Sequence, residues 1–306
     1  MDAPVCGVVN LYKEAGYTSQ DAIHVLQGIL HADKIGHTGT LDPEATGVLP
    51  VCIGKATKAA EIITGTDKEY RAQLRFGAET DTQDATGKVL KTFIYTFDEA
   101  LVRQVCASFV GEILQTPPMY SALKHNGQKL YQLARAGMEV ERKPRSIIIH
   151  ALDILDLNES GMTILVRCSK GTYIRTLCED IGKKLGYGAY MSALERTGCG
   201  PYRVEESFTL KQIEVMMQED RRDEFLVDLG TLFAHLPAWQ VIPEEDILLL
   251  SGNYLTYPSD CIDGREGDAV RMLLSDGRLA ALYRISEHPI LEGVPHTRLR
   301  AYKMFV

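Results

Sequence analysis

The chain lacks the features that mark membrane and secreted proteins. None of its apolar runs approaches the roughly 20 residues that a helix needs to cross a bilayer. The first residues, Met1 to Pro4, show no basic region followed by an apolar core, which is the pattern of a secretory signal peptide. We therefore expect a cytoplasmic protein that binds no membrane.

Patterns that bind metal ions are also missing. Seven cysteines are scattered along the chain without a C-x-x-C pair, and their odd number leaves at least one thiol free. This usage is typical of a reducing compartment and argues against a cysteine-based metal site. The eight histidines include no H-x-x-x-H pair, so no zinc site is evident.

Nucleotide-binding loops are absent as well. Six residues separate Gly47 from Gly54 where a phosphate loop has four, and Ala56 replaces the Ser or Thr that would hold Mg²⁺. A Gly-x-Gly occurs at 186–188, but Met191 occupies the position of the third glycine in a dinucleotide fingerprint. We expect a protein that uses neither a metal nor a cofactor.

Negative charge dominates the chain as a whole but not every part of it. The net charge is −8, and residues 204–250 alone carry eleven acidic against three basic side chains. Residues 120–203 are basic, with thirteen basic against eight acidic side chains. Because polyanion binding needs a local positive surface rather than a positive total, a nucleic-acid partner stays open. A solvated face of mixed charge is the alternative.

Apolar periodicity divides the chain into a large α+β part and a small β part. The patterns predict strands over 5–11, 68–76, 147–157 and 162–168, a hairpin or loop over 80–87, helices beginning near 18, 57, 98 and 173, and an acidic helical region over 204–235. After Pro237 short strands follow, with a hairpin signal at Asp276-Gly277. We predict a main domain over 1–236 and a C-terminal β domain over 237–306.

One loop is a candidate for chemistry. In Lys34-Ile35-Gly36-His37-Thr38-Gly39-Thr40-Leu41-Asp42-Pro43 a single acidic residue stands in a segment of Gly, Thr and Pro, flanked by Lys34 and His37, which can hold an anion. Turn-rich backbone of this kind can present one side chain at a surface. The alternative is an ordinary Asx turn, in which the Asp42 side chain bonds its own backbone, and these ten residues do not decide between the two.

Three further segments place polar or aromatic residues at element boundaries. Tyr70 stands at the start of a strand, and Tyr173 and Arg175 stand at a glycine-mediated turn from a strand into a helix. The segment Ser192-Ala193-Leu194-Glu195-Arg196 is expected to follow another strand. Taken singly, the two tyrosines fit a packing role better than a functional one.

A basic segment with aromatic residues interrupts the regular elements over about 115–146. It begins with Pro117-Pro118 and mixes aromatic and aliphatic residues with cations. We expect a basic, aromatic-bearing insertion between regular elements. The family resemblance given below implies that this insertion contacts an RNA backbone through Lys124, Lys129, Arg142, Lys143 and Arg145, and contacts of this kind position RNA without reading its sequence.

Four motifs together resemble those of a known family. GHTGTLDPEATGVLPVCIG, DKEYRAQLRFG, PPMYSALKHNGQKLYQLARAG and CSKGTYIRTLCEDIG occur in the order found in the TruB family of tRNA pseudouridine synthases, and the similarity spans about residues 5–203. The resemblance implies a catalytic domain with a mixed, mainly antiparallel central sheet flanked by helices and loops. It also implies conversion of the uridine at position 55 in the tRNA T-loop to pseudouridine, without a cofactor.

The resemblance also implies roles for individual residues. The catalytic aspartate of the family corresponds to Asp42, its active-site tyrosine to Tyr70, and the Tyr and Arg of its K-G-T-Y-I-R motif to Tyr173 and Arg175. The leucine that lines its substrate pocket corresponds to Leu194. These assignments make Asp42, Tyr70 and Arg175 the expected catalytic residues.

Two less regular matches complete the comparison of motifs. The loop histidine of the family corresponds to His37, and the lysine of its Lys-Pro-x-Gly-x-Thr-Ser run to Lys13, both expected to contact substrate. Here Glu14 stands where the family has proline. The C-terminal β domain resembles a PUA-type barrel only weakly in its motifs.

The chemistry of a base exchange leaves the role of the carboxylate open. Asp42 could attack C1′ of the ribose, take a proton from C2′, or add to C6 of the uracil. The rival functions are a tRNA-binding folding factor without catalysis and a subunit of a guide-RNA particle. We expect a monomer that acts on the T-arm of tRNA and requires no protein partner.

Overall fold

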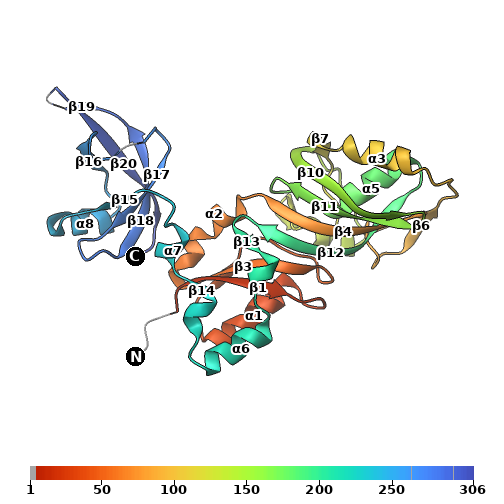
Figure 1. Cartoon of the computed structure of the whole chain (residues 1–306), viewed down its shortest axis with the longest axis horizontal. Coiled ribbons are helices and arrows are strands. Elements are labelled where there is room, and N and C mark those ends of the chain that lie inside the picture. Colours follow the sequence, from red (N-terminus) through yellow and green to blue (C-terminus); the bar gives the residue numbers. More distant parts are fainter. Residues whose placement is uncertain (1–4, 263, 292) are drawn as a thin grey trace.

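The computed structural model describes residues 5–262, 264–291 and 293–306. The expectation about a signal sequence at residues 1–4 falls outside the described residues. Figure 1 shows two parts, a large one around an extended sheet and a smaller one, near the C-terminus, around a second sheet. Within the described residues no helix has both the length and the apolar character needed to span a membrane.

A ten-stranded mixed sheet forms the centre of the large part. Its main order is β14 (Leu226–Val227), β1 (Gly7–Lys13), β3 (Thr46–Ile53), β12 (Ala189–Cys199), β4 (Lys68–Phe76), β11 (Gly161–Cys168), β10 (Arg145–Asn158) and β7 (Gly111–Gln115), with β2 (Ile35–His37) beside β3 and β13 (Tyr202–Arg203) beside β12. Neighbours are antiparallel except β12 and β3, which run parallel. The expected mixed, mainly antiparallel α+β architecture is confirmed.

Two groups of helices cover the sheet. Helices α1 (Ser19–Leu30) and α6 (Leu210–Gln218) pack on the β1–β3 half, where Leu11, Leu26 and Ile213 are buried in one cluster. As expected, Thr18 caps α1, in a capping box with Asp21. This cap satisfies helix N–H groups that would otherwise lack partners.

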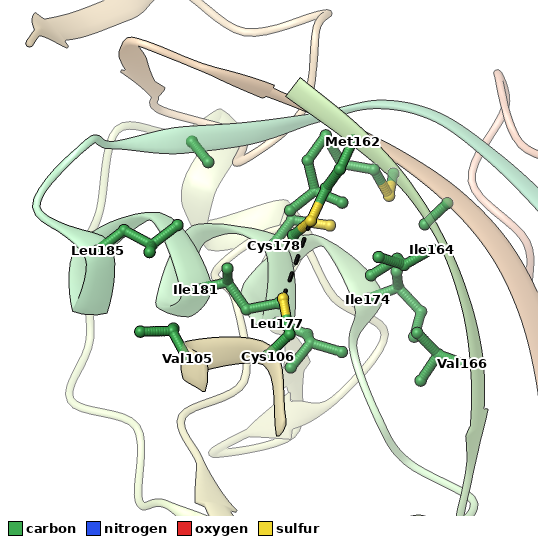
Figure 2. Packing of buried hydrophobic residues seen from close by; sticks show 14 of the residues in the cluster. Val105, Cys106, Met162, Ile164, Val166, Ile174, Leu177, Cys178, Ile181 and Leu185 are labelled. Carbon is green, nitrogen blue, oxygen red and sulfur yellow. Dashed lines mark hydrogen bonds between the residues drawn. The ribbon is translucent and has the colours of Figure 1, made fainter. Parts of the chain in front are cut away.

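Helices α3 (Glu99–Ala107) and α5 (Ile174–Leu185) cover the other half, where a second cluster packs against strands β4, β10 and β11. Figure 2 shows this cluster, in which Cys106 on α3 approaches Met162 on β11, with their sulfur atoms 3.8 Å apart. The two clusters meet where β12 and β4 pair, because Tyr70 and Leu194 pack against both. The site described below lies at this junction.

Shorter elements connect the strands of the large part. They are η1 (Gly54–Ala59), α2 (Ala60–Thr64), β5 (Ala78–Thr80), β6 (Val89–Thr92), β8 (Lys124–His125), β9 (Gln128–Lys129), α4 (Leu130–Arg135), η2 (Val204–Glu206), η3 (Arg222–Glu224) and α7 (Leu229–Leu232). The pairing of β5 with β6 confirms a hairpin around 80–87. The insertion expected at 115–146 holds a small hairpin, β8–β9, followed by α4.

One expectation about local structure is confirmed only in part, and another is wrong. Residues 204–235 are mostly helical, as expected, but not throughout, because β14 interrupts them and pairs with β1 at Val8 and Val9. That long-range pairing overrides local helical preference. The segment 192–196 lies inside β12 rather than after a strand, since β12 begins at Ala189 directly after the glycine turn at 186–188.

The C-terminal part contains a separate six-stranded sheet. Its strands are β15 (Ala238–Gln240), β16 (Leu255–Pro258), β17 (Ala269–Leu273), β18 (Leu279–Glu287), β19 (Ile290–Leu291) and β20 (Val294–Met304), with η4 (Pro243–Glu245) and α8 (Asp246–Leu250) preceding β16. The hairpin expected at Asp276-Gly277 joins β17 to β18. The small β part is therefore present, while the boundary at 236/237 stays a prediction.

Candidate active site

Loop 38–45, between β2 and β3, is fixed at both ends by buried contacts. The Thr38 hydroxyl donates to the Pro50 carbonyl at 3.1 Å, and the Leu41 N–H donates to Ser19 Oγ at 2.9 Å. Thr38, Ser19 and Leu41 are all nearly inaccessible to solvent. A loop held in this way presents the next residue, Asp42, in a defined position.

Lys13 holds the other side of the loop from inside the protein. Its side chain is 1% exposed, and its Nζ donates to the carbonyls of Glu14, Pro43 and Ala45 at 2.9, 2.9 and 2.7 Å. Burial lowers the Lys13 pKa from 10.5 to about 8. Because all three donors are directed to backbone carbonyls, Lys13 organises the Asp42 loop in this structure and does not face a ligand.

A two-pronged ion pair joins Asp42 to Arg175. The Arg175 Nε lies 3.0 Å from Asp42 Oδ2, and a terminal nitrogen lies 3.2 Å from Oδ1. The guanidinium thus contacts both carboxylate oxygens, one through a hydrogen bond and the other through an ion pair, a geometry that a lysine cannot match. The alternative of an Asx turn at Asp42 is wrong. Among the described residues, the Asp42 carboxylate bonds Arg175 rather than its own backbone.

Arg175 is buried and has several further partners. Its side chain is 7% exposed whereas that of Asp42 is 37% exposed, so the carboxylate is the accessible member of the pair. The guanidinium also donates to the Tyr120 carbonyl at 2.7 Å and the Thr82 carbonyl at 3.3 Å. Asp84 lies 3.8 Å away as a second carboxylate.

The environment opposes ionisation of Asp42. Burial raises the pKa of its carboxyl above the ordinary 3.8, the Arg175 guanidinium opposes that rise, and Asp84 adds to it. A carboxylate with reduced hydration and one bidentate partner is suited to act on a bound molecule.

Tyr70 and Leu194 are half-buried residues on the neighbouring strands β4 and β12. Leu194 on β12 is paired with Ala72 on β4, two residues from Tyr70. Burial raises the pKa of the Tyr70 hydroxyl to about 12, although the Arg196 guanidinium opposes the rise. Tyr70 is therefore a neutral phenol at physiological pH.

Arg196 is a component that the sequence did not single out. It is 1% exposed, pairs in register with Tyr70, and donates through Nε to the Val48 carbonyl at 2.7 Å. It lies beside the loop, 3.5 Å from the Gly39 carbonyl. The only signal was an arginine within a strand that is otherwise poor in charge, and such a pattern usually denotes a surface position.

His37 and Tyr173 flank the centre as neutral groups. Burial and the Arg196 cation lower the pKa of His37, whose Nδ1 accepts the Gly39 N–H at 3.3 Å. The neutral form of the His37 ring is therefore favoured, and the expected contact of His37 with substrate stays a prediction. Tyr173 is the N-cap residue of α5, and burial raises its hydroxyl pKa.

The five predicted RNA-contacting cations of the insertion are not all in the same environment. Lys124, Lys129, Lys143 and Arg145 are exposed. Arg142 differs, because its side chain is only 22% exposed and bonds the Pro117 carbonyl and Glu139. Arg142 therefore stabilises the insertion from within, and its geometry does not support the expectation that it contacts an RNA backbone.

Asp42 is not among the residues that line two hollows of the described structure. One, of about 370 Å³, is lined by residues of β4, β11 and β13 including Arg167 and Arg203. The other, of about 220 Å³, lies between the 80–83 turn, the insertion and α5. Among the described residues, His, Cys, Asp and Glu form no group of three or more that could hold a metal ion.

Comparison with solved structures identifies the fold. The chain superimposes over 98% of its length on a protein in a Cbf5-Nop10-Gar1 complex, covering 85% of that protein with a TM-score of 0.73 and 28% identity. A protein in an H/ACA RNP bound to a substrate RNA containing 2′-deoxyuridine matches equally widely, with a TM-score of 0.72 and 26% identity. The fold of the chain is thus that of a pseudouridine synthase.

Sequence comparison then defines the family. Residues 27–174 match the N-terminal domain of TruB family pseudouridylate synthases, and residues 175–235 match the tRNA pseudouridylate synthase B C-terminal domain. tRNA pseudouridine synthase B of Bacillus pumilus is 41% identical over 94% of this chain and 95% of its own, and that of Burkholderia mallei is 44% identical over 92% and 93%. The chain belongs to the TruB family of pseudouridylate synthases.

Proposed function

We propose that this protein isomerises uridine to pseudouridine in tRNA, at position 55 of the T-loop, with Asp42 as the reacting carboxylate. The observation that carries the proposal is the accessible Asp42 carboxylate paired in two-pronged fashion with the buried Arg175. Relatives at 41% and 44% identity that are named tRNA pseudouridine synthase B support tRNA as the substrate.

The reaction needs the kind of group that this site supplies. The bond between N1 of uracil and C1′ breaks, a bond from C5 to C1′ forms, C5 loses a proton and N1 gains one. No atoms are lost overall. Attack at C1′, proton removal from C2′ and addition at C6 all require ionised Asp42, and the site does not select among them.

The target base must leave the folded T-arm to reach Asp42. Extrusion of a stacked base costs a few kcal/mol, and stacking on an aromatic ring returns roughly 1–3 kcal/mol. Tyr70, a neutral phenol next to Leu194, is the proposed stacking surface, and Tyr173 the proposed side wall. Tyr70 could also transfer the C5 proton late in the reaction.

The direct test measures tritium release from tRNA that carries C5-labelled uridine. Asp42→Asn should reduce release below detection while tRNA binding persists, because the amide keeps the shape but loses the charge.

A matched control is Asp33→Asn, which alters an exposed aspartate in the segment before β2. It should leave turnover unchanged. Normal turnover by Asp42→Asn would refute the role of Asp42. Using an unmodified tRNA transcript and no other protein or guide RNA also tests the rival of a particle subunit, because that rival predicts no turnover by the isolated chain.

The cellular setting is part of the proposal. All seven cysteines are free, which fits a reducing cytoplasm. We propose that the protein acts there on tRNA as a monomer.

A further inference from the structure

We propose that Gln115 is a positioning residue for this reaction, because its side-chain amide fixes the backbone of Tyr173 and, through the first turn of α5, the direction of Arg175. The inference rests on the proposed function and extends it to a residue outside the catalytic group. Gln115 is the last residue of β7 and is 2% exposed.

The amide of Gln115 makes a two-point clamp on one residue. The Tyr173 N–H donates to Gln115 Oε1 at 2.8 Å, and Gln115 Nε2 donates to the Tyr173 carbonyl at 3.1 Å. Both bonds require a single orientation of the amide, since exchanging O and N would place like groups together. The clamp therefore fixes the orientation of the Tyr173 peptide groups as well as their position.

Helix α5 needs such an anchor because its own N-cap residue cannot supply one. Tyr173 occupies the N-cap and makes no side-chain capping bond, as expected for a residue type without a short polar side chain. Its carbonyl already accepts the first helical bond from the Leu177 N–H at 3.0 Å. The Gln115 amide reaches the same carbonyl from a neighbouring strand and joins the start of α5 to the sheet.

Two side chains of the proposed site depend on this anchor. Tyr173 is held directly, and Arg175 follows two residues later, in the first turn of the helix. Arg175 must keep both contacts with the Asp42 carboxylate, an ion pair at 3.0 Å and a hydrogen bond at 3.2 Å. A shift of about 1 Å at the start of α5 would break these contacts, and displacements of this size reduce catalytic rates by roughly 100-fold.

The competing interpretation is that Gln115 only stabilises the fold. It also stands two residues before Pro117-Pro118, with which the insertion begins. In that case its loss would lower the melting temperature and tRNA affinity together with the rate. A positioning role instead predicts that the chemical step slows while binding and melting change little, because the cations of the insertion are untouched.

The experiment compares full-length Gln115→Met and Gln115→Glu with the wild type, by single-turnover tritium release from saturating labelled tRNA, filter binding of tRNA, and thermal melting. Gln115→Met removes both bonds, and Gln115→Glu keeps the acceptor for the Tyr173 N–H but removes the donor. We expect rate constants lower by about 10- to 100-fold for Met and by about 10-fold for Glu. The dissociation constants should stay within about twofold of the wild type.

The matched control makes the same two substitutions at Gln73, an exposed glutamine on strand β4 of the same sheet, and should leave all three quantities unchanged. If Gln115→Met keeps the wild-type rate, or loses affinity, melting temperature and rate in parallel, the positioning role is refuted. If Gln115→Met does not fold, Gln115→Glu decides by the same criteria, and failure of both to fold assigns Gln115 to the fold alone. Absence of release by the wild type would overturn the proposed function itself, which separates the two outcomes.

Discussion

At the scale of single residues, the site is one buried cation shared between two carboxylates. Arg175 bonds Asp42 directly and lies 3.8 Å from Asp84. The Asp84 carboxylate is itself held by the Thr86 N–H and hydroxyl, at 2.9 and 2.6 Å. The ionisation of Asp42 therefore depends on a neighbour of like charge as well as on its partner.

The pH dependence follows from these charges. Ionised Asp42 is the reactive form in the proposed reaction, so kcat/KM should fall as the pH drops through its pKa, which burial places above 3.8. Asp84→Asn removes a like charge that raises the Asp42 pKa and should therefore shift this acid limb to lower pH. The pH profile of kcat/KM measures this shift, because it reports groups of the free enzyme.

The control for this prediction is Asp81→Asn, which removes an exposed carboxylate that is not among the groups acting on Asp42. Its acid limb should match that of the wild type. An upward shift for Asp84→Asn, or equal shifts for both variants, would contradict the electrostatic account.

At the scale of elements, the insertion contains two kinds of cation. Lys143 is exposed, whereas Arg142 bonds the Pro117 carbonyl and Glu139. If exposed cations neutralise RNA phosphates, each contributes about one unit to the slope of log affinity against log salt concentration. The two neighbouring residues should therefore respond differently to truncation.

Lys143→Ala is expected to weaken tRNA binding and to reduce the salt slope by about one unit, while melting stays unchanged. Arg142→Ala should lower the melting temperature, because it removes bonds that brace the insertion. Filter binding over a range of salt concentrations, combined with thermal melting, checks both. A full unit of salt slope lost in Arg142→Ala without a change in melting would show that Arg142 binds phosphate after all.

At the scale of the whole molecule, the C-terminal sheet is joined to the large part by a shared apolar cluster. Phe305 after β20 stacks on Phe233 after α7, with ring centroids 5.8 Å apart and planes inclined by 20°. Both rings belong to a cluster that includes Val8 and Leu282 from the two sheets. An ion pair between Lys303 and Glu61, at 2.6 Å, lies at the same junction.

Phe305→Ala should uncouple the two parts. Phe305 is 2% exposed, and truncation of a buried phenylalanine costs about 3–5 kcal/mol. Urea denaturation should change from one transition to two, because the small sheet loses the contact that couples it to the large one. Ile290→Ala, at a side chain that is 73% exposed, is the control and should unfold as the wild type does. Two transitions in the wild type would contradict the coupling.

The sequence alone determined the elements whose signals are local, such as the Thr18 cap, the strand over 68–76 and the hairpin at Asp276-Gly277. Four ordered motifs also brought Asp42, Tyr70 and Arg175 together as candidates, because a family pattern carries information about distance in space that periodicity lacks.

Only the tertiary structure decided which partners these residues have. The pairing of β14 with β1, the burial of Arg196 beside Tyr70, the inward direction of Lys13 and the brace formed by Arg142 all depend on contacts between segments distant along the chain. From the sequence alone, a lone cation is expected at the surface, because burying a charge is costly. Only the tertiary structure shows the carbonyl and carboxylate partners from other segments that offset this cost. The clamp of Gln115 on Tyr173 spans 58 positions, and no local pattern of residues could have indicated it.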